Sequence, residues 1–177
     1  IDSNSLLTNN MNKLFKGIDG ILIPGGFGER GVEGKIQAVK YARMHNVPFF
    51  GLCLGMQVAV IEFARNVVKL KDANSTEFEP ECLHPVIDMI EEKRHLKDMG
   101  GTLRLGSYLC KLGRDTLSYK IYGKETVSER HRHRYEFNNR YRKKLAEHGM
   151  KFAGIYEEKN LVEIIEIPSH PWFVAVQ

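Results

Sequence analysis

The sequence predicts an α/β fold with a mostly parallel central sheet, helices on both faces and an additional β-rich part. Three observations lead to this prediction. A short apolar run at 20–23 ends in a glycine-rich loop, and the stretch 35–64 then alternates helix, strand and helix. The last part of the chain, from residue 152 on, consists of short apolar runs separated by turn residues. The first two features form a βαβα unit, which implies parallel strands, and the third adds strands beside them.

Length and composition place the chain among ordinary globular proteins. Its 177 residues fit one domain, and 42% hydrophobic with 27% charged residues is typical of a folded α/β protein. A formal net charge of +4 is too small to imply nucleic-acid binding by itself. Because neither a signal peptide nor a membrane-spanning run is recognisable, we expect a soluble, cytoplasmic protein.

The cysteines also favour a cytoplasmic location. Cys53, Cys82 and Cys110 lie far apart and form no C-x-x-C pair, which favours free thiols in a reducing environment. The chain begins at Ile1 without a methionine, so we expect a piece cut from a longer protein.

The first strands and the helix between them follow from local pattern. Residues 20–23 are predicted as a parallel strand that ends in the loop 24–28, Pro-Gly-Gly-Phe-Gly. This loop could hold a phosphate or offer backbone N–H groups to a developing oxyanion, and a plain structural turn is an equal alternative. Residues 35–45 carry apolar side chains at helical spacing, and 47–52 form the next strand.

The elbow around Cys53 is the centre of the prediction. Its strand ends in Gly-Leu-Cys-Leu-Gly, and a helix over 54–64 follows at once. We expect the two glycines to allow backbone conformations that a Cβ would forbid, and the helix N-terminus to lower the pKa of the thiol. The turn is the cysteine counterpart of the G-x-S-x-G nucleophile elbow, whereas the alternative is a buried structural cysteine. Because the loop 24–28 and Cys53 both follow parallel strands, we expect them to meet at one site.

Two polar segments in the middle of the chain allow more than one interpretation. Glu77 lies in a polar loop and is either a solvated carboxylate or a site residue. In the run 129–136, an extended strand would place Arg130, Arg132 and Arg134 on one face and two histidines on the other. The run is a solvated charged face, a nucleic-acid patch, or a place where an arginine grips a carboxylate.

The remaining stretches are assigned by pattern alone. Residues 91–98 are charged and are expected at the surface, and a strand-like section begins at 100 and runs through 112. Residues 139–148 are predicted as a helix that ends before Gly149. Further strands are expected at 152–156, 161–167 and 172–176.

A set of motifs resembles those of class I glutamine amidotransferases. The elbow Gly-Leu-Cys-Leu-Gly-Met-Gln at 51–57, following Ile-Pro-Gly-Gly-Phe-Gly at 23–28, is shared by that whole class. Segments that resemble the glutaminase domains of the CTP synthase family in particular are 30–35, 72–78, 100–106 and 129–136. The resemblance implies that residues 1–177 form one glutaminase domain, truncated at both ends, with the synthetase domain absent.

The resemblance implies hydrolysis of the glutamine side-chain amide through a cysteinyl thioester, with release of ammonia. Cys53 would be the nucleophile, and the backbone N–H groups of Gly26 and Leu54 would form the oxyanion hole. The positions that the family uses to hold L-glutamine are matched by Gly26, Leu54, Gln57, Glu77 and Arg134. No cofactor or metal is expected within this domain.

In the whole enzyme, the resemblance implies that the ammonia passes to a synthetase domain of the same enzyme, where ATP-activated UTP is aminated to CTP. ATP, Mg and the activator GTP are therefore implied for the whole enzyme, which we expect to be a homotetramer. Arg30 lies in a segment that matches the region near the domain junction where GTP acts. The roles of Arg30, Arg130 and Arg132 are left open, and we expect neither a membrane nor a nucleic acid as a partner.

The chain departs from the family pattern in one respect. The family's catalytic His and Glu lie in a Gln-aromatic-His-Pro-Glu segment. Residues 172–177 match only the part of the family sequence that precedes this His. The resemblance therefore places both partners of Cys53 beyond Gln177. His170 precedes the last strand and lacks the following Glu, so we interpret it as part of a structural turn. Because loss of triad members costs several orders of magnitude in rate, we expect this polypeptide alone to be nearly inactive.

Two alternatives accompany this interpretation. The first is another class I amidotransferase or a γ-glutamyl hydrolase, which the four CTP-synthase-like segments make less favoured. The second is a non-catalytic binding module, in which Cys53 is structural and the basic stretch 130–144 contacts nucleic acid or a partner. Salt-dependent nucleic-acid affinity without thiol reactivity would support the module.

Overall fold

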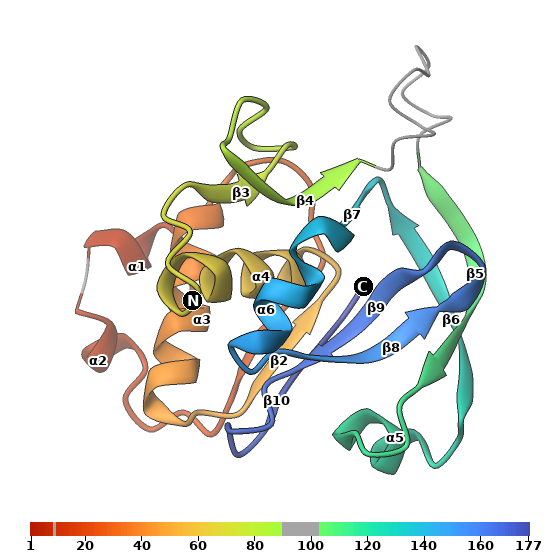
Figure 1. Ribbon diagram of the computed structural model, residues 1–177. Helices are drawn as coiled ribbons and strands as arrows, with labels where there is room; N and C mark the ends of the chain where they lie inside the picture. The colour runs from red at the N-terminus through yellow and green to blue at the C-terminus, as the bar shows by residue number, and fades with distance from the viewer. Residues whose placement is uncertain (9, 90–102) are drawn as a thin grey trace.

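The computed structural model describes residues 1–8, 10–89 and 103–177, and its main element is a seven-stranded sheet (Figure 1). In spatial order, the strands are β1 (Ile21–Ile23), β2 (Phe49–Leu52), β10 (Phe173–Val176), β9 (Leu161–Glu166), β8 (Lys151–Tyr156), β5 (Arg104–Leu112) and β6 (Thr126–His133). Parallel pairing joins β1, β2 and β10, and the remaining neighbours pair antiparallel. The predicted α/β class is confirmed, and the predicted β-rich part continues the parallel strands within the same sheet.

A second, smaller sheet was not predicted. It consists of β3 (Ala73–Ser75), β4 (His84–Met89) and β7 (Tyr135–Phe137). The chain crosses from the large sheet to the small one at Arg134, the residue between β6 and β7. The segment 72–78 was predicted as a polar loop, but residues 73 to 75 form an edge strand there. Pattern did not reveal it, because Ser75 is polar and yet fully buried.

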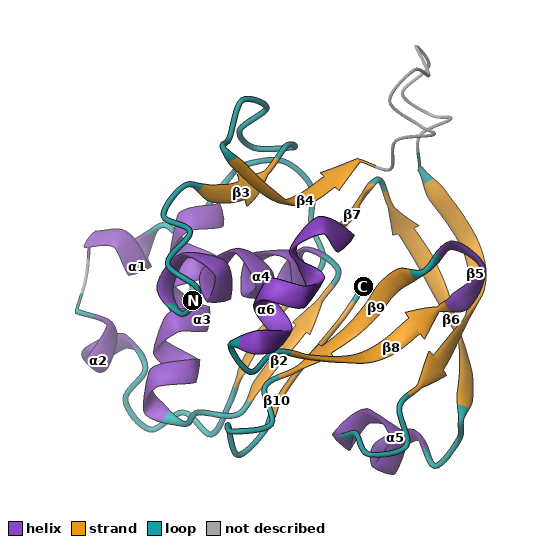
Figure 2. Cartoon of the chain, in the orientation of Figure 1, coloured by secondary structure: helices purple, strands orange, loops and turns teal. Residues whose placement is uncertain are grey.

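Helices pack on both faces of the large sheet, as predicted (Figure 2). One face is covered by α3 (Val32–His45), α4 (Leu54–Asn66) and α6 (Arg142–Glu147), and the other by α5 (Leu117–Tyr122). Further short helices are α1 (Ser5–Thr8), α2 (Met11–Leu14), η3 (Asn139–Tyr141) and η4 (Glu157–Lys159). The helix predicted at 139–148 therefore begins as a 3-10 turn.

Alternation along β2 separates the two cores. Phe49 stacks on Phe173 at 4.5 Å between ring centroids, within the core below α3 and α4. Phe50 points to the opposite face, where its ring meets Trp172 beside the core residues under α5. Successive residues of a strand face opposite sides, so one short strand contributes to both cores.

α4 lies between the two sheets and contacts strands of both. Every residue from Leu54 to Ala64 is buried, which is the pattern of a helix that is surrounded by protein. The N-terminus of this central helix therefore has a fixed place relative to the strand that precedes it. Within the described ranges, no helix is both long and apolar enough to cross a membrane. The predicted charged surface at 91–98 and the start of the motif at 100–106 lie outside the described residues.

Candidate active site

The carboxyl ends of the three parallel strands bring the candidate residues together. Ile23 pairs with Gly51 across β1 and β2, and Val176 pairs with Leu52 across β10 and β2. The backbone N–H of Cys53 donates to the carbonyl of Val176 at 2.7 Å. The glycine loop, the thiol and the residue after β10 thus meet at one edge of the sheet, where α/β proteins place their sites.

The backbone at Cys53 is strained, and its two flanking glycines are needed for close packing. Cys53 has φ +50° and ψ −102°, a sparsely populated conformation for a residue with a side chain. A Cβ on Gly55 would lie 2.3 Å from the carbonyl oxygen of Ile23, and one on Gly51 would lie 2.7 Å from the carbonyl carbon of Gly55. The glycines were predicted to supply unusual backbone angles; they instead allow strand and helix to approach, and the unusual angles belong to the cysteine.

The environment of the thiol differs from the prediction as well. Burial raises the pKa of Cys53 above its ordinary value of 9.0, and the charges of Glu77 and Glu136 raise it further. The backbone N–H of Leu54, at the start of α4, lowers this pKa, as does the side-chain amide of Gln177. The predicted stabilisation of thiolate by the helix N-terminus is therefore present, but desolvation outweighs it and the predicted lowering is wrong.

A pocket of about 280 Å³ opens beside the thiol. Its lining consists of Gly26, Phe27, Cys53, Gln57, Glu77, Leu103, His133, Arg134 and Tyr135. Most of the predicted site residues therefore share one cavity, although they come from four separate parts of the chain. The other predicted residue, Leu54, adjoins it: a Cβ on Gly26 would lie 3.1 Å from Cδ2 of Leu54.

Gln57 and Glu77 are both held by the backbone around the pocket. Gln57 is buried on α4, and its Nε2 donates to the carbonyl of Tyr135 at 3.1 Å. Glu77 Oε1 accepts a hydrogen bond from the backbone N–H of Gly28 at 2.9 Å. The carboxylate of Glu77 thus ties the glycine loop to the loop after β3 and closes one side of the pocket.

Other residues of the site were missed by sequence reasoning. Gln177 lies directly after β10, and its Nε2 donates to Sγ of Cys53 at 3.5 Å. The rule that identified Cys53, a polar residue after a parallel strand, would have found Gln177 if it had been applied to the third strand. The contribution of Tyr135 is a backbone carbonyl, which leaves no signal in the sequence.

The arginines of the run 129–136 do not share one face. Arg130 and Arg132 are exposed on β6, and His131 and His133 are buried on its other face, as the period of two predicts. Arg134 was predicted beside the first two arginines, but it follows the end of the strand and lines the pocket instead. The change of sheet at this residue breaks the alternation.

Two further predicted features lie apart from the pocket. His170 is buried; its Nε2 lies 3.1 Å from the carbonyl of Ala42, and its Nδ1 accepts from the backbone N–H of Trp172. The predicted structural turn is confirmed. The carbonyl of Arg30 accepts from Lys35 Nζ at 2.9 Å, and Arg30 is not among the pocket residues. No group of His, Cys, Asp and Glu suited to a metal ion occurs in the part of the chain that the structure describes.

A cysteine on a strained strand-to-helix elbow, beside a glycine loop and a pocket with both a carboxylate and a guanidinium, matches a known class of enzyme. The model of the family Glutamine amidotransferase class-I matches residues 2–177. The chain therefore belongs to the class I glutamine amidotransferases.

Within that family, the chain is similar to CTP synthases. It is 56% identical to the CTP synthase of Geobacillus kaustophilus and 55% identical to that of Bacillus subtilis, in each case over the full 177 residues. The chain spans 33% of the length of each of these relatives. The solved glutaminase domain of Trypanosoma brucei CTPS, with bound acivicin, superposes with a TM-score of 0.92 at 42% identity. That match covers all of this chain and 70% of the other.

A more distant neighbour shares the fold alone. It is a glutamine amidotransferase from Thermotoga maritima, at 13% identity with a TM-score of 0.54. That match covers 88% of this chain and 54% of the other. The chain is thus a class I amidotransferase domain homologous to the glutaminase domain of CTP synthase.

Proposed function

We propose that Cys53 of this domain hydrolyses the side-chain amide of glutamine, and that the released ammonia is used by a larger enzyme to convert UTP to CTP. The observation that carries the proposal is the position of the thiol on a strained elbow, at a pocket that also contains Glu77 and Arg134. A carboxylate suits the α-ammonium group of glutamine, and a guanidinium suits its α-carboxylate.

The chemistry follows from these groups. The thiolate of Cys53 attacks the side-chain carbonyl carbon, and the developing oxyanion accepts hydrogen bonds from the backbone N–H groups of Gly26 and Leu54. The C–N bond then breaks, the amide nitrogen takes up the proton that the thiol released on becoming thiolate and leaves as ammonia, and a thioester remains. Water attacks the thioester, glutamate departs, and the thiol is restored.

The 177-residue polypeptide alone is expected to turn over slowly. In the described part of the chain, the Cys53 sulfur is contacted by the Gln177 amide and the Leu54 backbone N–H, and neither can act as a base at neutral pH. The raised pKa of Cys53 keeps the thiol protonated near pH 7. A glutaminase assay of this polypeptide with normal turnover would contradict this expectation.

The decisive experiment is mass spectrometry after treatment with a diazo-ketone analogue of glutamine, with and without excess glutamine. Selective labelling of Cys53 over Cys82 and Cys110, suppressed by glutamine, is the expected result. Cys110 is the internal control, because burial raises its pKa to about 12. Absence of glutamine-protected labelling in the full-length protein that contains these residues would contradict the proposal.

The finer proposal concerns that full-length protein, in which we expect a cytoplasmic homotetramer that uses ATP and Mg, with GTP as activator. No residue of the chain described here is assigned to those ligands. The variant Cys53→Ser should lose CTP formation from glutamine, while CTP formation from added ammonium salt continues at the parental rate. Loss of both activities would show that Cys53 supports the fold rather than the chemistry.

A further inference from the structure

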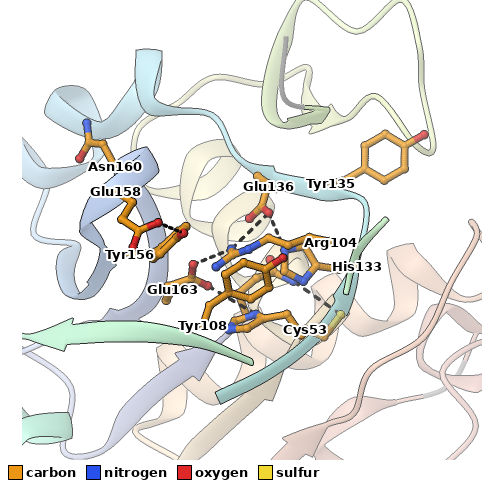
Figure 3. A network of polar contacts seen from close by, with 12 residues as sticks. Cys53, Arg104, Tyr108, His133, Tyr135, Glu136, Tyr156, Glu158, Asn160 and Glu163 are labelled. Carbon is orange, nitrogen blue, oxygen red and sulfur yellow. Dashed lines mark hydrogen bonds and ion pairs between the residues drawn. The ribbon is translucent and has the colours of Figure 1, made fainter. Parts of the chain in front are cut away.

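A group of buried ionisable side chains lies next to the glutamine pocket (Figure 3). Its members are Arg104 on β5, His131 and His133 on β6, Glu136 on β7 and Glu163 on β9, each at most 5% exposed. Nη1 of Arg104 lies 3.3 Å from Oε1 of Glu136 and 2.6 Å from Oε1 of Glu163. One permanent cation thus faces two carboxylates in the interior.

Stability alone does not account for this group. Buried ion pairs are often no more stabilising than apolar side chains of the same volume. Within the described residues, Nε of Arg104, Nδ1 of His133 and Oε2 of Glu136 have no hydrogen-bond partner, which adds a desolvation cost. Burying this group therefore costs free energy, which the specific contacts that it makes have to offset.

The contact that reaches the pocket is the one between His133 and Glu136. Nε2 of His133 lies 2.6 Å from Oε1 of Glu136, so the two ends of a four-residue corner are joined. The residues between them, Arg134 and Tyr135, both line the glutamine pocket. The ring of Tyr135 points away from the buried group (Figure 3). Its carbonyl accepts a hydrogen bond from Nε2 of Gln57 at 3.1 Å.

We propose that Glu136 is a positioning residue for glutamine, because it holds the corner 133–136 closed and so directs Arg134 and the Tyr135 carbonyl to the pocket. This inference rests on the proposed function, and it assigns to Arg104 the role of counter-charge for Glu136. Glu163 belongs to the same buried group and lies even closer to Arg104, but its other neighbour is His131, whose Nδ1 lies 3.6 Å from Oε2 of Glu163, outside the corner. It is therefore the matched control.

The test compares Glu136→Ala, Glu136→Gln and Glu163→Gln in the full-length enzyme, by the KM and kcat for glutamine. Glu136→Ala should raise KM at least about tenfold with a much smaller change in kcat, because substrate contacts are displaced and the thiol is not. Glu136→Gln keeps an oxygen acceptor for His133 and should raise KM about threefold, because a charge-assisted bond becomes a neutral one. Glu163→Gln should leave KM within about twofold of the parent.

A second readout separates positioning from a general loss of structure. The rate of Cys53 labelling by the diazo-ketone should fall with the rise in KM, and labelling by iodoacetamide, which needs no glutamine contacts, should not fall. CTP formation from ammonium salt should stay at the parental rate in all three variants. If Glu136→Ala does not accumulate as folded protein, the KM values of Glu136→Gln and Glu163→Gln are compared instead. Each of these two variants removes one charge from the same group.

Two results would overturn the inference. An unchanged KM in the Glu136 variants contradicts it, and so does an equal rise in KM for Glu163→Gln, which would make the group merely structural. A parental enzyme without glutamine hydrolysis would contradict the proposed function and this inference with it, whereas an active parent with unchanged variants contradicts the inference alone.

Discussion

The positive φ of Cys53 is maintained by close packing on both sides of the residue. Gly51 and Gly55 allow β2 and α4 to approach each other and β1 more closely than any side chain would permit. At the residue scale, close packing therefore determines the backbone conformation of the elbow. Its chemistry follows from the position of the thiol beside the pocket at one edge of the sheet.

We expect Gly55→Ala to destabilise the chain by about 3 kcal/mol or more, because the new methyl group would meet backbone of β1 that cannot move aside. Gly25→Ala is the matched control from the glycine loop, since its Cβ would lie 3.6 Å from Cβ of Cys53, an ordinary contact. It should change the free energy of unfolding by less than about 1 kcal/mol in urea denaturation. Equal losses for the two variants would contradict the packing argument.

The raised pKa of Cys53 predicts a specific pH dependence. The thiolate is the reactive form, so the rate of alkylation by iodoacetamide in the folded chain should still be rising at pH 9. In the urea-unfolded chain, burial is lost and the same titration should move down to the ordinary pKa of a cysteine. Peptide mass spectrometry of Cys53 in the two states measures the difference, and coincident curves would refute it.

At the scale of elements, α3 and α4 are joined by a partly buried ion pair. Glu62 on α4 is completely buried, and its carboxylate accepts hydrogen bonds from Nε and Nη2 of Arg43 on α3, at 2.8 and 2.7 Å. The pair links the two helices that cover one face of the sheet. The contact also orients α4, whose N-terminus carries the site.

Arg43→Met should destabilise the chain by about 3–5 kcal/mol, because it leaves the Glu62 carboxylate buried without a counter-charge. Replacing both residues by methionine should recover most of that loss, since no buried charge then remains. The exposed pair Arg114 and Glu125 is the control, and Arg114→Met should change the free energy of unfolding by less than about 1 kcal/mol. A double variant as unstable as Arg43→Met would contradict the account.

At the scale of the whole molecule, the buried group behind the pocket affects acid stability. Burial and the charges of Arg104 and the neighbouring His133 together lower the pKa of His131 from 6.5 to about 4, although Glu136 acts in the opposite direction. The unfolded state therefore binds a proton at His131 below pH 6.5, whereas the folded state does so only near pH 4. Stability contributed by the neutral ring falls as the pH drops through this window.

The loss of folding stability due to His131 should reach up to about 3 kcal/mol between pH 6.5 and pH 4, measured as the free energy of unfolding in urea. His131→Gln removes the titration, so its stability should depend less on pH over the same range. Glu163 faces His131 and has a raised pKa, which acts in the opposite direction, and the difference between parent and variant isolates the histidine. Identical pH profiles for the two proteins would disprove the assignment.

Local patterns of the chain predicted much of the architecture. The glycine loop, the elbow at Cys53, the helices that became α3 and α4, and the three last strands all appear close to their predicted bounds. These elements share one property: apolar runs, helical spacing or glycines mark them locally, so the sequence records them. The small sheet β3-β4-β7 was missed, because its strands are short and partly polar and are stabilised by contact with α4.

By itself, the sequence determined the fold class and indicated the candidate nucleophile and the loop that meets it, because glycine, apolar periodicity and the ends of parallel strands are local features. Only the tertiary structure decided the pKa of the thiol, the corner that brings Arg134 into the pocket, and the burial of Arg104 with two carboxylates. Desolvation and long-range charge contacts depend on which segments come together, and no stretch of the chain carries that information alone.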